Sequence, residues 1–193
     1  MLRAVLLSLA FIGAAAFASE EVLSSPYLPM QVGAKWEFQT NKGKAVSEIT
    51  SSESVRGLDC VHLQTTMGEM EPSEEIIGVS PAGVCRLAYG STALEPAVLM
   101  LKLNPKAGDR WDSEITEGAQ KIKGTFSVTE EDVKVPAGAF HTFCVTGVFQ
   151  VQGNSVTTKT WYAKNVGIVK QLAQSGANQV TSELTRYTPG AKQ

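Results

Sequence analysis

The segment from Ile122 to Val128 reads Ile-Lys-Gly-Thr-Phe-Ser-Val, and its apolar residues alternate with polar ones. Successive side chains of a β-strand point to opposite faces, so Phe126 and Val128 share one face while Thr125 and Ser127 share the other. The stretch 143–151, Phe-Cys-Val-Thr-Gly-Val-Phe-Gln-Val, repeats this pattern. Alternation with one polar face is typical of an antiparallel sheet.

Weaker alternation recurs at 35–40, 45–51, 58–66, 156–163, 166–173 and 178–187, between clusters of Gly, Pro, Asn and Ser. Helical periodicity is nearly absent, and we interpret the one ambiguous segment, 91–102, as a strand. We therefore predict an all-β fold of about ten antiparallel strands in a strongly curved sheet or flattened barrel. Its predicted interior residues, which are also the candidate ligand-binding residues, are Trp36, Phe38, Phe126, Phe143, Phe149 and Trp161.

Two parts of the chain resemble each other. Residues 32–36, Val-Gly-Ala-Lys-Trp, match residues 107–111, Ala-Gly-Asp-Arg-Trp, at an offset of 111 − 36 = 75. Cys60-Val61 matches Cys144-Val145 at an offset of 84, and residues 83–86 match 167–170 at the same offset. Matches in the same order indicate two similar five-strand halves, with about nine residues inserted near 135–138 of the second half.

The first residues have the pattern of a secretory signal peptide. One positive residue, Arg3, precedes an apolar run that ends at the small-residue site Ala16-Phe17-Ala18, and polarity rises at Ser19-Glu20. The run is shorter than the ~20 apolar residues that cross a membrane. We expect residues 1–18 to be a cleaved signal peptide and residues 19–193 to form a single β domain, exported to the periplasm or the exterior.

The charge pattern argues against nucleic acid as a partner, and the hydropathy argues against a transmembrane helix in the mature chain. The formal net charge is −2, and no run of Lys or Arg forms the basic stripe that nucleic-acid binding requires. After signal cleavage no stretch is long and apolar enough to be a transmembrane helix. The length that remains suits one domain with a sizeable core.

The cysteines and histidines are the main candidates for chemistry, and they are few. Three cysteines in an exported chain allow one disulfide, for which Cys60 and Cys144 are the candidate pair, or separate free thiols. With His62 and His141 the same cysteines could form a zinc site, but His141 and Cys144 point to opposite strand faces. We therefore expect no metal. We also expect no cofactor and no catalytic residue, and neither histidine sits at a nucleophile elbow.

Four segments of the chain resemble a widespread family of secreted bacterial proteins of unknown function, the TapB-like family. They are residues 27–38, with the first Gly-x-x-Trp; residues 103–111, with the second; the Val-Pro-Ala-Gly-Ala-Phe of 135–140; and the Trp-Tyr-Ala-Lys-Asn-Val-Gly-Ile-Val-Lys of 161–170. The resemblance covers nearly the whole mature chain. It implies an exported antiparallel β fold and no established catalytic residues.

The sequence does not identify a ligand, a partner or an oligomeric state. A curved sheet with an apolar face either fills its interior or encloses a ligand. We therefore expect a non-catalytic envelope protein that binds an apolar small molecule or lipid. The alternative is a structural or interaction module that contacts an envelope protein through a sheet face or edge.

Overall fold

The computed structural model describes residues 23–117, 120–151 and 153–191. The predicted signal peptide, residues 1–18, lies outside them. Within the described residues the chain forms twelve strands and no helix. The strands are β1 (Lys35–Thr40), β2 (Gly43–Val55), β3 (Leu58–Met67), β4 (Ser73–Ser80), β5 (Gly83–Tyr89), β6 (Thr92–Lys102), β7 (Arg110–Glu117), β8 (Gln120–Val135), β9 (Gly138–Val151), β10 (Asn154–Ala163), β11 (Gly167–Ser175) and β12 (Asn178–Thr188).

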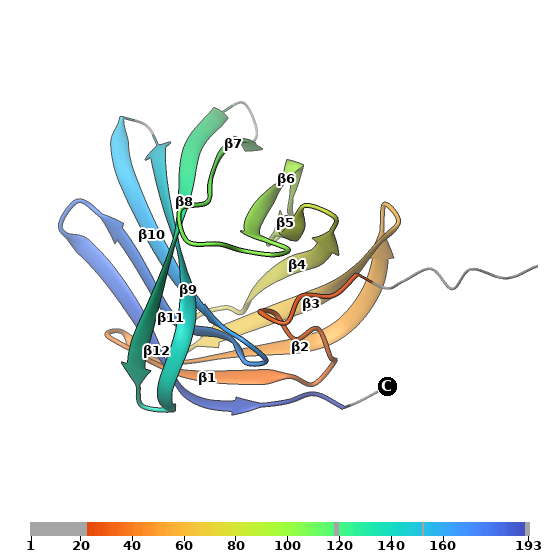
Figure 1. Cartoon of the computed structure of the whole chain (residues 1–193), viewed down its shortest axis with the longest axis vertical. Coiled ribbons are helices and arrows are strands. Elements are labelled where there is room, and N and C mark those ends of the chain that lie inside the picture. Colours follow the sequence, from red (N-terminus) through yellow and green to blue (C-terminus); the bar gives the residue numbers. More distant parts are fainter. Residues whose placement is uncertain (1–22, 118–119, 152, 192–193) are drawn as a thin grey trace, which may run out of the picture.

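The strands form a closed antiparallel barrel in which each strand lies beside its neighbours in sequence and β1 pairs with β12 (Figure 1). The predicted all-β antiparallel barrel is confirmed, although about ten strands was too low a number. The strands that the alternation does not reveal are β4, β5 and β7. In β4 and β5 three consecutive residues are buried, at 77–79 and 83–85, so neither of these two strands alternates between apolar and polar residues.

A matching glycine turn precedes β1 and β7, so the halves of the predicted repeat would be β1–β6 and β7–β12, with six strands each rather than five. Each half opens with a glycine at positive φ, Gly33 (85°) and Gly108 (89°). Their amides donate to equivalent carbonyls, Gly33 to Ile49 at 2.8 Å and Gly108 to Val128 at 2.9 Å. Left-handed backbone suits glycine, which explains why this residue recurs ahead of each Trp.

The second hairpin of each half continues beyond the barrel wall and packs over the outside of the sheet. The β2–β3 turn reaches β6, where Arg56 forms an ion pair with Glu95. The longer β8–β9 hairpin reaches β12, where the amide of Ala137 donates to Leu184 O at 2.9 Å. The inserted residues of the second half thus lengthen this hairpin, whose strands have 16 and 14 residues against 13 and 10 in β2–β3.

One end of the barrel is filled by the chain itself. The indole N–H of Trp36 donates to Val166 O at 2.6 Å, in the β10–β11 turn. The amide of Asn165, in the same turn, donates to Pro26 O at 2.6 Å, which ties the N-terminal segment to it. Tyr27 from that segment packs edge-on against Phe143. These residues are continuous with the main hydrophobic core, which includes Leu28 and Trp36 and draws side chains from strands of both β1–β6 and β7–β12.

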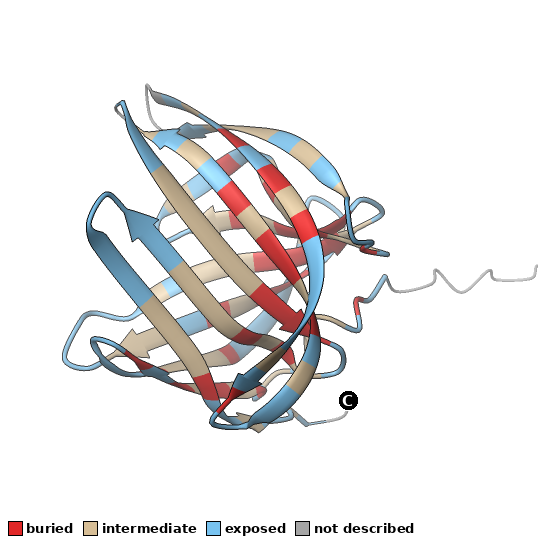
Figure 2. Ribbon diagram, turned by 60° about the vertical axis from the view of Figure 1, so that its left-hand side comes forward, coloured by how far each residue is buried: buried red, intermediate tan, exposed pale blue. Residues whose placement is uncertain are grey.

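Buried and more exposed residues alternate along the strands (Figure 2). One cross-strand row on the interior face runs from β7 to β12 through Trp111, Phe126, Gly147, Thr158, Ala173 and Val180. Phe126 is 7% exposed and Val180 is 36% exposed. The interior is therefore tightly packed beside β7–β9 and more open beside β11–β12.

Candidate functional site

The wall of the barrel has one weak junction, between β6 and β7. These strands share a single registered pair, Glu95 with Thr116, whereas each of the other eleven junctions between described strands has at least six. The symmetry-related junction, β1 with β12, is fully paired. Backbone groups without a ladder partner leave a strand edge available to other partners.

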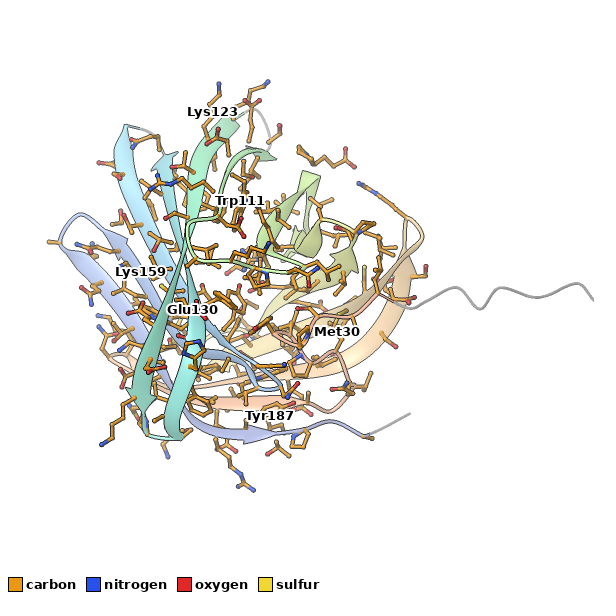
Figure 3. All side chains as sticks on the ribbon, in the orientation of Figure 1. Met30, Trp111, Lys123, Glu130, Lys159 and Tyr187 are labelled. Carbon is orange, nitrogen blue, oxygen red and sulfur yellow. The ribbon has the colours of Figure 1, made fainter. Side chains whose placement is uncertain are left out.

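Side chains replace part of the missing ladder. The indole N–H of Trp111 on β7 donates to Leu99 O on β6 at 3.1 Å. Lys102 Nζ lies 2.9 Å from Asp109 Oδ1 and 5.8 Å from the centre of the Trp111 ring. Trp111 thus joins the two strands through one hydrogen bond, and it lies between β7 and β6 in Figure 3.

An aromatic cluster lies directly behind this junction. Trp111 stacks on Phe126 with ring centres 5.1 Å apart and an interplanar angle of 10°. Phe126 in turn meets Phe149 edge-on at 5.3 Å. Two glycines make room for the Phe149 ring: a Cβ on Gly124 or Gly147 would lie within 3.0 Å of it. Trp111, Phe126 and Phe149 are called the aromatic cluster below.

The outer face of β7–β9 carries nine outward-facing residues in three cross-strand rows, called the polar grid below. The rows are Arg110–Ser127–Thr146, Asp112–Thr125–Val148 and Glu114–Lys123–Gln150. Two hollows of about 620 and 480 Å³ lie over the grid. Trp111 and Phe126, which also line the smaller hollow, alternate along β7 and β8 with its outward-facing residues, so their rings lie on the opposite, interior face. Both hollows are open depressions of the sheet surface rather than enclosed cavities.

The grid holds two positive and two negative side chains. Glu114 is engaged by Lys121 at 2.9 Å and by Lys123 at 3.5 Å. These lysines hold the pKa of Glu114 below its usual value, mainly through the hydrogen bond from Lys121. Lys123 itself projects from the end of β8 (Figure 3). The sequence signal for this surface is the polar side of the alternating strand at 122–128, which our candidate residues do not include.

Each histidine is held between two carboxylates. His62 Nδ1 lies 2.6 Å from Glu74 and its Nε2 lies 2.8 Å from Glu53. The hydrogen bond that His62 donates to the Glu74 carboxylate is the main reason that the pKa of His62 is raised, with Glu53 adding to it. His141 is likewise bonded through Nδ1 to Asp132 at 2.7 Å and through Nε2 to Glu130 at 2.8 Å, which raises its pKa.

The three cysteines are buried free thiols, so the structure does not contain the expected Cys60–Cys144 disulfide. The physical reason is the repeat itself. Equivalent positions of two six-strand halves lie on opposite sides of the barrel, and five strands separate β3 from β9 in either direction. The same separation prevents His62 and His141 from sharing a zinc ion, and among the described residues no three His, Cys, Asp or Glu side chains are arranged so that they could hold a metal ion.

Burial makes the thiols of Cys60 and Cys144 weaker acids than a free cysteine. Desolvation raises the pKa of Cys60 and raises that of Cys144 to about 11, with the Glu131 carboxylate adding to the shift of Cys144. Cys60 and Cys85 flank Gly78 in a small cluster under the β2–β3 turn. A thiol in such surroundings is a poor nucleophile.

Of the predicted interior residues, Phe126 and Phe149 belong to the aromatic cluster. Trp36, Phe38 and Phe143 pack elsewhere in the main core, and Trp36 stacks on Tyr187. Trp161 lies on the opposite face, in the outward row with Cys144 and Lys170. Its indole N–H donates to Glu131 Oε1 at 2.9 Å, so the six residues do not form one site.

No family model and no curated protein sequence matches the chain. The fold is similar to that of a protein from Bacteroides fragilis NCTC 9343, described as a candidate exported protein with a YmcC-like fold, at 14% identity and a TM-score of 0.52 over 83% of this chain and 98% of that one. A candidate lipoprotein from Parabacteroides distasonis ATCC 8503 aligns at 14% identity and a TM-score of 0.40, over 84% of this chain and 98% of that one.

The similarity to the Bacteroides protein shows the fold alone. The resemblance to the TapB-like family stays a prediction. No helix long and apolar enough to cross a membrane occurs in the described part of the chain.

Proposed function

We propose that this chain is an exported, non-catalytic binding protein of the bacterial envelope, and that it takes up an apolar or lipid-like molecule through the β6–β7 junction. Export is supported by the signal-peptide pattern of residues 1–18 and by the description of the similarly folded Bacteroides protein as a candidate exported protein.

One observation carries the binding proposal: the aromatic cluster lies behind the junction that has a single registered pair. Aromatic rings offer a large apolar area to a ligand. Separating β6 from β7 sacrifices few cross-strand hydrogen bonds, so access here costs less than at any fully paired junction. A ligand that replaces Trp111 at the junction would rest on Phe126 and Phe149.

The side chains that could act as nucleophiles or bases support the non-catalytic part of the proposal. Both ring nitrogens of each histidine are already bonded to carboxylates. The Cys60 and Cys144 thiols have raised pKa values because they are buried. Catalysis by a Cys–His pair requires the two side chains to be within hydrogen-bond reach, and these are bonded elsewhere.

Native mass spectrometry tests the proposal on mature protein purified without detergent from its own exported pool. We expect wild-type protein to carry extra mass that dissociates as lipid-like species. Phe149→Ala should lose that mass, because it removes one wall of the aromatic cluster. Phe140→Ala, the same substitution on the β8–β9 extension, is the control and should retain it. Bare wild-type protein, or full retention by folded Phe149→Ala, would contradict the proposal.

The second candidate function is an interaction module, and the two hollows over the polar grid favour it. In that case the aromatic cluster is only core, and a partner contacts the outer face of β7–β9. Two results together would support this second function. Wild-type protein would carry no extra mass, and it would capture a partner that Val148→Asp does not capture. Val148 is the apolar centre of the grid and is 37% exposed.

A further inference from the structure

The polar grid has the composition of a site for a neutral, hydrogen-bonding group. Arg110 and Lys123 balance Asp112 and Glu114, so the formal charge of the grid is zero. Between the charges lie the hydroxyls of Thr125, Ser127 and Thr146 and the amide of Gln150, groups that both donate and accept hydrogen bonds. A hydroxyl-rich molecule can satisfy such a mixture of donors and acceptors.

The same composition disfavours an anionic group. A phosphate is bound by converging cations and backbone amides, and nearby carboxylates repel it. Asp112 and Glu114 lie in two of the three rows, and Lys123 is already paired with Glu114. A phosphate on the grid would therefore face a carboxylate on β7 in either of these rows.

The polar grid and the aromatic cluster occupy the two faces of the same strands. Trp111 lies between Arg110 and Asp112 on β7, the strand that borders the weak junction, so its ring is on the face opposite the grid. An amphiphilic molecule that passes through the β6–β7 junction would meet polar groups outside the wall and aromatic rings behind it. The hollow of about 480 Å³ is large enough for a sugar-sized head group.

We propose that the polar grid holds the uncharged, hydroxyl-rich head group of an amphiphile, such as a glycosyl or polyol head, while its apolar tail enters the β6–β7 junction. This inference rests on the proposed function, because the aromatic cluster must accept the tail. It adds the chemistry of the head group, which the aromatic cluster does not determine.

Two detergents with the same twelve-carbon tail separate the head from the tail. Calorimetric titration of the mature protein with dodecyl maltoside and with dodecylphosphocholine, each below its micelle concentration, measures the preference between the heads. We expect dodecyl maltoside to bind at least about tenfold more tightly. Thr125→Val should reduce that preference by about threefold or more, because one hydroxyl of the grid is lost. Thr129→Val, on the same strand outside the grid, is the control and should keep it.

The outcomes distinguish the two proposals. Equal affinity for both detergents, or tighter binding of dodecylphosphocholine, would overturn the head-group inference and leave the tail site standing. A preference for maltoside that Thr125→Val leaves unchanged would also overturn it, because the head would then lie elsewhere. Binding of neither detergent would overturn both the inference and the proposed function.

Discussion

Replacement of Gly124 by alanine tests the packing of the aromatic cluster. A Cβ at this position would lie 2.4 Å from Phe149 Cδ1 and 2.7 Å from its Cε1. Carbon atoms pack at about 3.5–4.0 Å, so the ring must move by about 1 Å. The ring has little room to move, because a Cβ on Gly147 would also lie 2.9 Å from it. Overpacking of this kind costs about 1–3 kcal/mol.

Alanine also brings a benefit, since glycine within a strand is about 0.5–1 kcal/mol less favourable than alanine. The expected net loss for Gly124→Ala is therefore about 1–2 kcal/mol in the free energy of unfolding. In a Phe149→Ala background the ring contacts disappear and the 3.2 Å approach to Val148 O remains, so the same substitution should stabilise the protein by at most about 0.5–1 kcal/mol. The two sites are expected to couple by about 1–3 kcal/mol.

Urea unfolding of the four proteins of this double-mutant cycle measures the coupling from the midpoints and a common m-value. A coupling energy below about 0.5 kcal/mol, or a stabilising Gly124→Ala in the wild-type background, would refute the reasoning. Either result would mean that Phe149 does not lie over Gly124.

The junction, one histidine and the cysteines give further predictions. Amides of β6 and β7 should exchange hydrogen faster than those of β1 and β12, and equal protection would show that the β6–β7 ladder is complete. The pKa of His62 is raised in the folded state, so its ion pairs with Glu53 and Glu74 stabilise the protein fully below the unfolded value of 6.5 and are lost as the pH rises through the folded value. The loss of stability in His62→Gln should therefore be larger at about pH 6 than at about pH 9, whereas a difference that does not change with pH would disprove this role. Without reductant, the native protein should resist thiol alkylation at about pH 8 and the unfolded protein should label at all three cysteines; labelling of only one would reveal a disulfide.

The sequence correctly predicts which side chains face the barrel interior where the other face of the strand is exposed to solvent. Phe126 and Val128 lie opposite Gly147 and Val145 on the interior face, as the alternation at 122–128 and 143–151 indicates. Segment 91–102, interpreted as a strand, is β6. Alternation fails for β4 and β5 because both of their faces are buried.

The site depends on features that strand patterns do not encode. The weak β6–β7 junction arises because the edges of the two strands share only one registered pair. A polar–apolar pattern shows which face of a strand is buried, and it does not show whether the strand's edges are paired. The sequence predicts Trp161 in the interior, but the residue lies on the outer face of β10, where Glu131 of the β8–β9 extension accepts its indole N–H. Trp111 was recognised from the repeat, yet only its hydrogen bond to Leu99 shows that it bridges the junction.

A cross-link across the junction tests most directly whether ligands enter there. Glu95 and Thr116 are ladder partners, and such Cα atoms lie about 4.5–5.5 Å apart, within disulfide range. Lys35 and Thr188, partners in the fully paired β1–β12 junction, provide the matched control. Oxidised Glu95→Cys/Thr116→Cys should bind dodecyl maltoside at least about tenfold more slowly than its reduced form, while oxidised Lys35→Cys/Thr188→Cys should bind as fast as wild type. Unchanged uptake after the Glu95–Thr116 cross-link forms would contradict entry through the β6–β7 junction.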